Sequence, residues 1–324
     1  MSPISIETVV SIAVACYISW GIGANDETMA MAAGGTSWSI DRIVIFGAIF
    51  AFVGAVLFGQ IVEKTIGTEL LLVEVTYQIA LLIVGATALW LTVASWFGWP
   101  VSTTHTAVGA IIGFGIMAGG LETINWEGFS GVFWGWALSP LIGLLIAFVV
   151  CLAARFLTGG ALAERVIPER GWVYLSLSAG LLTEFWRGAN DVGNATAFLS
   201  VTFADPLLPR VISGVGMAVG LIILGRKVIY TVGTQITRLP PSATFFTQVA
   251  TVVTIAVGTL MGLPMSGTHI LVGSILGAGL AVRSEINRRV VAYVILAWFV
   301  TFPAGALFTM LITHTLSYFG LFAF

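Results

Sequence analysis

Residues 23–26 read Gly-Ala-Asn-Asp, and residues 188–191 repeat the same four residues inside another apolar segment. Two further matches lie at almost the same offset, which ranges from 164 to 166 residues. They pair TIGTEL at 65–70 with TVGTQI at 231–236, and PVSTTH at 100–105 with PMSGTH at 264–269. Three matches in one order indicate an internal duplication. We therefore divide the chain into a first repeat (1–155), a linker (156–172) and a second repeat (173–324).

The composition around these motifs is that of a membrane protein. Of 324 residues, 9% are charged and 58% are apolar, and the mean hydropathy is +1.04. Soluble domains have roughly 25% charged residues, so a soluble enzyme, a nucleic-acid-binding protein and a disordered chain are excluded. The apolar content suffices for about nine helical spans of ~20 residues. We interpret residues 4–22 as the first span and not as a signal peptide, because no basic segment precedes them.

Each repeat contains five apolar segments in the same order. They are 4–35, 42–59, 76–97, 100–118 and 129–153, then 173–198, 208–225, 243–262, 264–282 and 290–323. Their apolar runs are continuous, which favours helices over the alternating strands of a barrel. The sequence predicts an all-α polytopic protein. The third and fourth segments of each repeat, at 76–118 and 243–282, form either two spans or a re-entrant hairpin.

Loop charges orient the repeats relative to each other. The loop at 119–128 carries two glutamates and no basic residue, whereas the corresponding loop at 283–289 carries three arginines. Basic residues mark short cytoplasmic loops, so corresponding loops are expected on opposite faces and the repeats are inverted. Inverted repeats with broken helices are typical of secondary transporters, whose site lies near the membrane midplane between the repeats.

The Gly-Ala-Asn-Asp motifs predict a cation site. Gly, Asn and Asp weaken or cap helices, so we expect each first helix to break there, with Asp26 and Asp191 heading the second half. A carboxylate inside the membrane is costly and indicates function. With freed backbone carbonyls it suits a hard cation. The alternative is that both aspartates only cap half-helices.

The Pro-x-Ser motifs predict an oxyanion site in two copies. Pro100 and Pro264 suit the first turn of a helix. Hydroxyl residues follow beside free backbone N–H groups at the positive end of the helix dipole, a setting that binds anions. These residues are Ser102, Thr103, Thr104, Ser266 and Thr268. Gly267 replaces one hydroxyl residue but leaves its N–H open to close approach. The alternative is ordinary Ser/Thr capping.

Other polar residues of the apolar segments have less certain roles. His105 and His269 either contact the anion, carry a proton, orient a neighbour or are purely structural. Glu27 adds a carboxylate that binds a cation, carries a proton or faces a water-filled cavity. For Glu184 and Arg187, which lie three residues apart, the sequence favours an ion pair over direct anion contact by the arginine.

These motifs resemble those of the inorganic phosphate transporter (PiT) family. The resemblance covers essentially the whole chain and includes GANDVGNA at 188–195, both Pro-x-Ser-x-Thr-His segments and GRKVIYTVG at 225–233. It implies a non-enzymatic phosphate symporter of the cell membrane, driven by sodium ions or protons, without a cofactor or nucleic-acid partner and often homodimeric. The implied cation ligands are Asn25, Asp26, Asn190, Asp191 and Asn194. The implied phosphate contacts are Ser102, Thr103, Thr104, Ser266, Gly267 and Thr268.

The sequence departs from the family pattern in the first Asn-Asp motif, which continues Glu27-Thr28-Met29 in place of Val-Ala-Asn, and at Gly267. Met29 replaces a second Asn of the first motif, so one cation ligand is lost and Glu27 is the candidate to compensate. Gly267 replaces the usual Ser or Thr, which predicts a weaker second anion half-site. The main alternative function is a sulfate or other oxyanion permease of the same fold. A passive channel and an intramembrane hydrolase are further alternatives, although catalytic residues rarely occur as symmetric duplicates.

Overall fold

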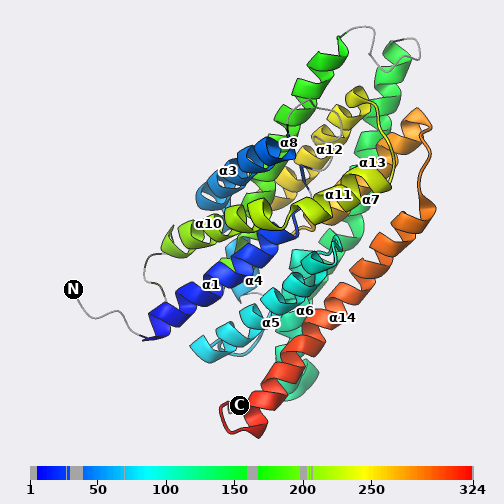
Figure 1. Cartoon of the computed structure of the whole chain (residues 1–324). Coiled ribbons are helices and arrows are strands. Elements are labelled where there is room, and N and C mark those ends of the chain that lie inside the picture. Colours follow the sequence, from blue (N-terminus) through cyan, green and yellow to red (C-terminus); the bar gives the residue numbers. More distant parts are fainter. Residues whose placement is uncertain are drawn as a thin grey trace.

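The computed structural model describes residues 6–26, 28–29, 39–68, 70–158, 167–197, 203, 205 and 207–322 (Figure 1). Glu27 and residues 159–166 of the linker at 156–172 lie outside the described residues. Apart from two isolated β-bridges, the regular structure of the described part is helical. The predicted all-α fold is confirmed.

The helices follow the predicted apolar segments closely. The first repeat contains α1 (Ile6–Ala24), α3 (Ile40–Phe58), α4 (Gln60–Thr68), α5 (Tyr77–Trp96), α6 (Thr103–Gly119), the short 3-10 helix η1 (Gly120–Thr123) and α7 (Trp126–Leu157). The second contains α8 (Glu169–Asp191), α9 (Gly193–Thr196), α10 (Leu207–Ile223), α11 (Arg226–Gln235), α12 (Pro241–Leu260), α13 (Gly267–Val282) and α14 (Arg288–Tyr318). Seven of the described helices are long and apolar enough to cross a membrane.

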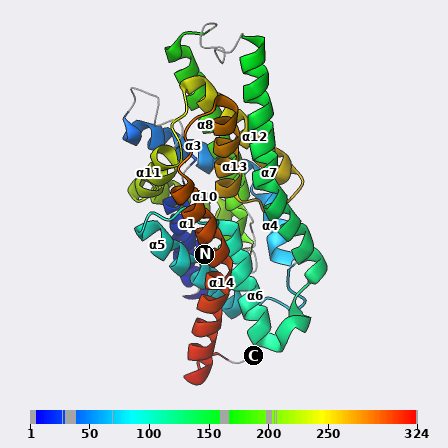
Figure 2. The same cartoon turned by 90° about the vertical axis from the view of Figure 1, so that its right-hand side faces the viewer.

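The repeats pack by exchanging helices. The first helix of each repeat lies on the second helix of the other, so α1 packs on α10 and α8 packs on α3. The last helix of each repeat covers the hairpin helix of the other, so α7 packs on α13 and α14 packs on α6. Figure 2 shows α14 running down the front of this assembly and α7 along its right-hand side. The two repeats therefore bury their apolar faces against each other and share one core.

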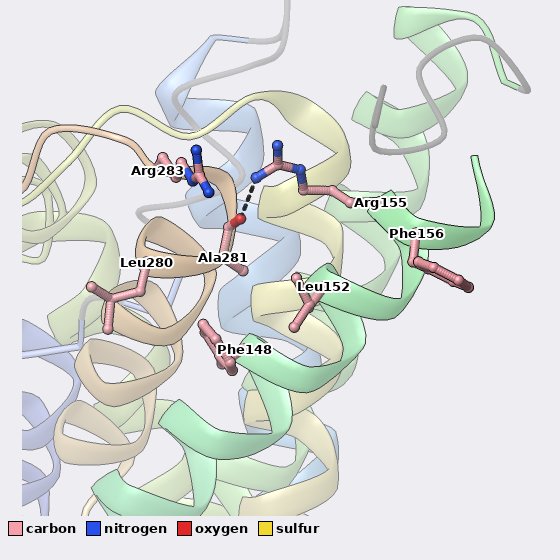
Figure 3. Close-up of a pocket in the computed structure, with 7 residues that line it drawn as sticks. All are labelled: Phe148, Leu152, Arg155, Phe156, Leu280, Ala281 and Arg283. Carbon is pink, nitrogen blue, oxygen red and sulfur yellow. Dashed lines mark hydrogen bonds between the residues drawn. The ribbon is translucent and has the colours of Figure 1, made fainter. Parts of the chain in front are cut away.

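Corresponding loops lie at opposite ends of the molecule. Helix α7 has 32 residues, which is about 48 Å at 1.5 Å per residue. The acidic segment Gly120–Thr123 lies just before its first residue. At its other end Arg155 Nη1 donates a hydrogen bond of 2.5 Å to the carbonyl oxygen of Ala281, just before the basic loop at 283–289 (Figure 3). This arrangement is the one that inverted repeats require.

Both hairpins, α5–α6 and α12–α13, begin to turn back at a left-handed glycine. Gly98 has φ 69° and Gly262 has φ 73°. Residues with a Cβ atom avoid this left-handed region of backbone conformation. After each glycine an N–H closes back on the preceding helix, from Trp99 to Ala94 and from Leu263 to Gly258. These are helix-terminating turns of the Schellman type. The residues predicted as spans or re-entrant segments thus form helical hairpins.

One predicted helix break is placed differently. Helix α1 ends at Ala24, and Asp26 lies beyond it as expected. In the second repeat, however, α8 continues through Asp191 and α9 begins at Gly193. The prediction that Asp191 heads a half-helix is wrong, because its carboxylate is bound by Arg187 one turn earlier, at 3.1 Å, and does not cap.

Close helix crossings depend on specific glycines, which gives a stability test. A Cβ at Gly54 of α3 would overlap the carbonyl oxygen of Phe185 in α8, whereas a Cβ at Gly85 of α5 meets no atom within 4 Å. We expect Gly54→Ala to destabilise the protein by about 1–3 kcal/mol through overpacking. Gly85→Ala should be neutral or stabilising because Ala favours helix. Thermal unfolding in detergent measures both, and equal melting temperatures for the two variants would contradict this packing.

Candidate functional site

The two hairpin tips meet in the interior of the protein. Thr104 Oγ1 donates to the carbonyl oxygen of Met265 at 3.0 Å, and Thr268 Oγ1 donates to that of Val101 at 3.2 Å. Thr104 corresponds to Thr268 and Val101 to Met265 in the duplication, so the two bonds are symmetry mates. The N-termini of α6 and α13 are thereby brought together.

Asn25 holds the first tip in position. Its Nδ2 donates to Ser95 Oγ at 3.1 Å and to the carbonyl oxygen of Trp99 at 2.8 Å, and its Oδ1 accepts from the Val101 N–H at 3.1 Å. The side chain is fully buried. A buried amide with three partners binds the end of α1 to the hairpin turn, a structural role that the sequence analysis missed.

Asn190 makes the same three bonds in the second repeat. Its Nδ2 donates to Thr259 Oγ1 at 2.9 Å and to the carbonyl oxygen of Leu263 at 3.0 Å, while its Oδ1 accepts from the Met265 N–H at 2.9 Å. Both amide protons of each asparagine are used, and each Oδ1 retains one lone pair. Asn25 and Asn190 can therefore each offer only this one lone pair to the predicted cation.

Arg187 lies between the two predicted aspartates. Its Nε is 3.1 Å from Asp191 Oδ2, and its Nη1 is 3.4 Å from Asp26 Oδ1 across the repeat boundary. The arginine side chain is 2% exposed. The sequence interpretation favoured an ion pair with Glu184 and missed this position at the site. The sequence does contain a signal for this position. An arginine, Arg187, directly precedes the second Gly-Ala-Asn-Asp motif, whereas the apolar Ile22 precedes the first.

Threonine hydroxyls complete the polar centre. Thr103 Oγ1 donates to Asp191 Oδ1 at 3.1 Å. The Arg187 guanidinium donates to Thr28 Oγ1 at 3.1 Å and to Thr268 Oγ1 at 3.3 Å. All of these side chains are buried. The structure therefore describes an occluded centre in which carboxylates, a guanidinium and hydroxyls from both repeats are in contact.

Gly267 makes room for the arginine. It corresponds to Thr103 in the duplication, and a Cβ at this position would lie 2.9 Å from Arg187 Nε and 3.0 Å from its Cδ. A Ser or Thr side chain at 267 would occupy the space of the guanidinium. The departure at Gly267 is thus sterically linked to the presence of Arg187.

Asn194 offers an oxygen to a cation. Its Nδ2 donates to the carbonyl oxygen of Asp191 at 3.2 Å. Its Oδ1 is buried and has no hydrogen-bond partner among the residues that the structure describes. An orphaned buried carbonyl is costly and is a suitable ligand for a hard cation. Its counterpart Met29 is buried in an apolar cluster, so the two repeats differ at this position.

The serines and histidines lie at the starts of α6 and α13. Ser102 Oγ and Ser266 Oγ accept from the N–H groups of His105 at 3.2 Å and of His269 at 3.3 Å, which is N-capping. His105 Nδ1 is also 2.6 Å from Ser102 Oγ. The two imidazole rings are 4.5 Å apart, and each lies 3.8 Å from a tryptophan ring, Trp136 or Trp298. The imidazole of His105 thus contacts its capping serine and fits an orienting role, whereas Nε2 of His269 is buried without a hydrogen-bond partner among the described residues.

Comparisons with known proteins agree on one family. Residues 22–309 match the family model described as the phosphate transporter family. A relative from Chlamydia pneumoniae, named as a phosphate permease, is 30% identical over 91% of this chain and 95% of its own length. The chloroplastic inorganic phosphate transporter 2-1 of Arabidopsis thaliana is 27% identical over 93% of this chain and 71% of its own.

A solved structure has the same fold. It is entitled the sodium-dependent phosphate transporter, and it matches with a TM-score of 0.86 and 25% identity over 97% of this chain and 100% of that chain. With the family model, the relatives and the fold in agreement, the chain belongs to the phosphate transporter family.

Proposed function

We propose that this protein takes up inorganic phosphate by symport with sodium ions or protons. Family membership supports phosphate as the substrate, and the name of the solved relative supports sodium as the coupling ion. The meeting of two helix N-termini around buried carboxylates and one arginine supports the proposal most directly. No enzymatic step and no cofactor are involved.

Phosphate binds between the tips of the two hairpins. Backbone N–H groups and hydroxyls at the starts of α6 and α13 face the centre, and the helix dipoles favour an anion there. The proposed contacts are Ser102, Thr103, Thr104, Ser266, Gly267 and Thr268. The hydroxyls of Thr103, Thr104 and Thr268 bond protein oxygens in the occluded arrangement. Binding therefore exchanges these internal hydrogen bonds for bonds to phosphate oxygens.

Cations compensate the charge of the centre. Two carboxylates and one guanidinium already leave a net negative charge, and a phosphate anion adds to it in a region of low dielectric. Anion entry without a cation is strongly disfavoured, which gives a physical reason for coupling. The proposed ligands are Asn25, Asp26, Asn190, Asp191 and Asn194, with the buried Oδ1 of Asn194 the oxygen most open to an ion. Glu27 remains a candidate, and His105 and His269 orient the capping serines.

Transport follows from movement of the repeats around this centre. The first repeat (1–155) and the second (173–324), joined by the linker at 156–172, rock so that the site opens to one side at a time. The protein is proposed to reside in the cell membrane as a multi-pass protein, and to form a homodimer as family members often do.

Uptake under separate gradients tests the coupling. We expect proteoliposomes to accumulate labelled phosphate above equilibrium when an inward sodium or proton gradient is imposed, and not when both are absent. Excess unlabelled phosphate should compete and excess sulfate should not. Equal uptake with and without the gradients would refute symport, and competition by sulfate would favour the oxyanion-permease alternative.

Neutralising the central aspartates tests their role. Asp26→Asn and Asp191→Asn keep the size of the side chain but remove a charge that binds Arg187. We expect each to reduce uptake about tenfold or more, since a charged hydrogen bond contributes ~1.5–3 kcal/mol. Asp41→Asn is the control, because Asp41 is exposed and its ion-pair partner is Arg226 and not Arg187. Wild-type uptake by either central variant would remove that aspartate from the site.

A further inference from the structure

Three departures from the symmetry of the repeats lie in or next to the motifs of the central site. Arg187 stands where the first repeat has Ile22, Gly267 where it has Thr103, and Met29 stands opposite Asn194. Arg187 touches Asp26, and the space of the missing side chain at Gly267 is filled by its guanidinium. The changes at positions 187 and 267 are therefore in direct contact, and Arg187 contacts both central carboxylates.

The two aspartates have different partners as a result. Thr103 Oγ1 donates to Asp191 Oδ1 at 3.1 Å. The symmetric position facing Asp26 is Gly267, which has no hydroxyl, and Arg187 Nη1 lies 3.4 Å from Asp26 Oδ1 instead. Both aspartates therefore contact the guanidinium, Asp191 at 3.1 Å and Asp26 at 3.4 Å, and Asp191 additionally accepts from the Thr103 hydroxyl.

The ligands available to a mobile cation differ in the same way. Beside Asp191, the buried Oδ1 of Asn194 has no hydrogen-bond partner within the described part of the chain. Beside Asp26, the equivalent side chain is the apolar Met29. A cation next to Asp26 would lack that oxygen, and the missing ligand is what makes the first repeat the weaker cation site.

We propose that Arg187 is a resident counter-ion shared by Asp26 and Asp191 and takes the place of one co-transported cation. This narrows the five proposed cation ligands: the mobile cation binds in the second repeat, at Asp191 and Asn194, where a buried amide oxygen is open to it. Arg187 is a residue that sets the stoichiometry, and each phosphate needs one cation fewer than it would with a neutral residue at 187. This inference rests on the proposed symport.

Thermal unfolding tests the counter-ion without any transport. Arg187→Gln leaves buried carboxylates without their positive partner. We expect its melting temperature to be lower than that of the wild type in choline chloride and to rise more steeply with sodium chloride at constant ionic strength. Arg210→Gln is the control, since Arg210 is a second buried arginine, 3.6 Å from Glu63. It should be destabilised with no gain in sodium dependence.

A double-mutant cycle tests the link to Gly267. We expect Gly267→Thr alone to be destabilising, because its Cβ would meet the Arg187 side chain, and to be much less so in the Arg187→Gln background. The double variant restores the hydroxyl that the first repeat has at Thr103. Additive effects of the two substitutions, or an Arg187→Gln protein no more sodium-dependent than wild type, would overturn the proposal.

The number of cations per phosphate provides the functional readout. At zero net flux, the exponent relating the phosphate accumulation ratio to the sodium gradient should rise by one in the Arg187→Gln, Gly267→Thr double variant. An unchanged exponent would overturn the proposal. If the wild type moves no phosphate, the proposed function fails, while the thermal measurements still test the counter-ion role of Arg187 independently.

A second inference concerns a groove between the ends of α7 and α13. It has a volume of about 610 Å³, and its apolar lining consists of Phe148, Leu152, Phe156, Leu280 and Ala281. Two arginines, Arg155 and Arg283, also line it, and Figure 3 shows their guanidinium groups together at one end, beyond the apolar side chains. The groove thus combines a doubly positive end with an apolar floor.

The charges of this groove lack an acidic partner in the structure as described. Neither arginine has a carboxylate oxygen within 4.0 Å among the described residues. Arg155 donates to the Ala281 carbonyl oxygen and retains other donors. Arg283 has φ 60° and is the one non-glycine residue with positive φ among those described. Glycine is preferred at such a helix end. An arginine at position 283 therefore adopts a backbone conformation that is unfavourable for a residue with a side chain.

The geometry points to an anionic phospholipid as the occupant. Its phosphate is held by Arg155 and Arg283, and its acyl chain lies along Phe148, Leu152 and Leu280. A basic pocket between membrane helices at the side rich in positive loops suits an anionic headgroup. Leu152, Phe156 and Leu280 are exposed on this floor, and they favour a lipid over free phosphate, which has no group to place against them.

Lipid binding to the detergent-purified protein tests this site. We expect fluorescent phosphatidylglycerol to bind more tightly than phosphatidylcholine, and Arg155→Gln and Arg283→Gly each to weaken the binding about fivefold. Arg283→Gly should melt no lower than the wild type, because glycine suits this backbone, so its loss of binding is not unfolding. Arg289→Gln, an exposed arginine of the same loop outside the groove, should bind like the wild type.

Three outcomes would overturn the lipid site. They are equal affinity for both lipids, unchanged phosphatidylglycerol binding in the Arg155 and Arg283 variants, and displacement of the lipid by inorganic phosphate. The last outcome would identify the groove as an anion site without a lipid chain.

Discussion

The centre of the protein depends on two buried asparagine amides that hold the hairpin tips. The interior of a bilayer supplies no water to unpaired backbone groups, so a helix can end there only if the protein provides partners. Asn25 and Asn190 do so with the same three bonds in each repeat. Because the tips are fixed, the N-termini of α6 and α13 meet, and their threonines reach across the repeat boundary.

On this symmetric scaffold the charges are asymmetric. Arg187 comes from the second repeat alone and contacts one aspartate from each repeat. The duplication supplies two equivalent carboxylates, and a single arginine makes them inequivalent. A symmetric fold permits two opposite-facing states of similar energy. Under the proposed symport, the asymmetric charge sets which ions accompany the substrate.

Much of the fold was predictable from the sequence because it depends on period and composition. The continuous apolar runs predicted the helices, and the opposite loop charges predicted opposite ends for the loops after α6 and α13. The position of Asp191 was not predictable in the same way. Its helix propensity favours a break, but the ion pair with Arg187 on the preceding turn stabilises the helix through it. Local preference was overridden by a side-chain contact that only a formed helix provides.

For the site, the sequence by itself determined which residue types recur at matched positions, namely the Asn-Asp pairs and the Pro-x-Ser segments, and hence the chemistry available to an anion and a cation. Only the tertiary structure decided how these groups are shared. It assigned Asn25 and Asn190 to the hairpin turns, joined Thr103 to Asp191 across the repeats, and put Arg187 into the space left by Gly267. The physical reason is that these contacts join residues about 75 or more positions apart. Their proximity is set by helices exchanged between the repeats, and no local pattern in the chain records it.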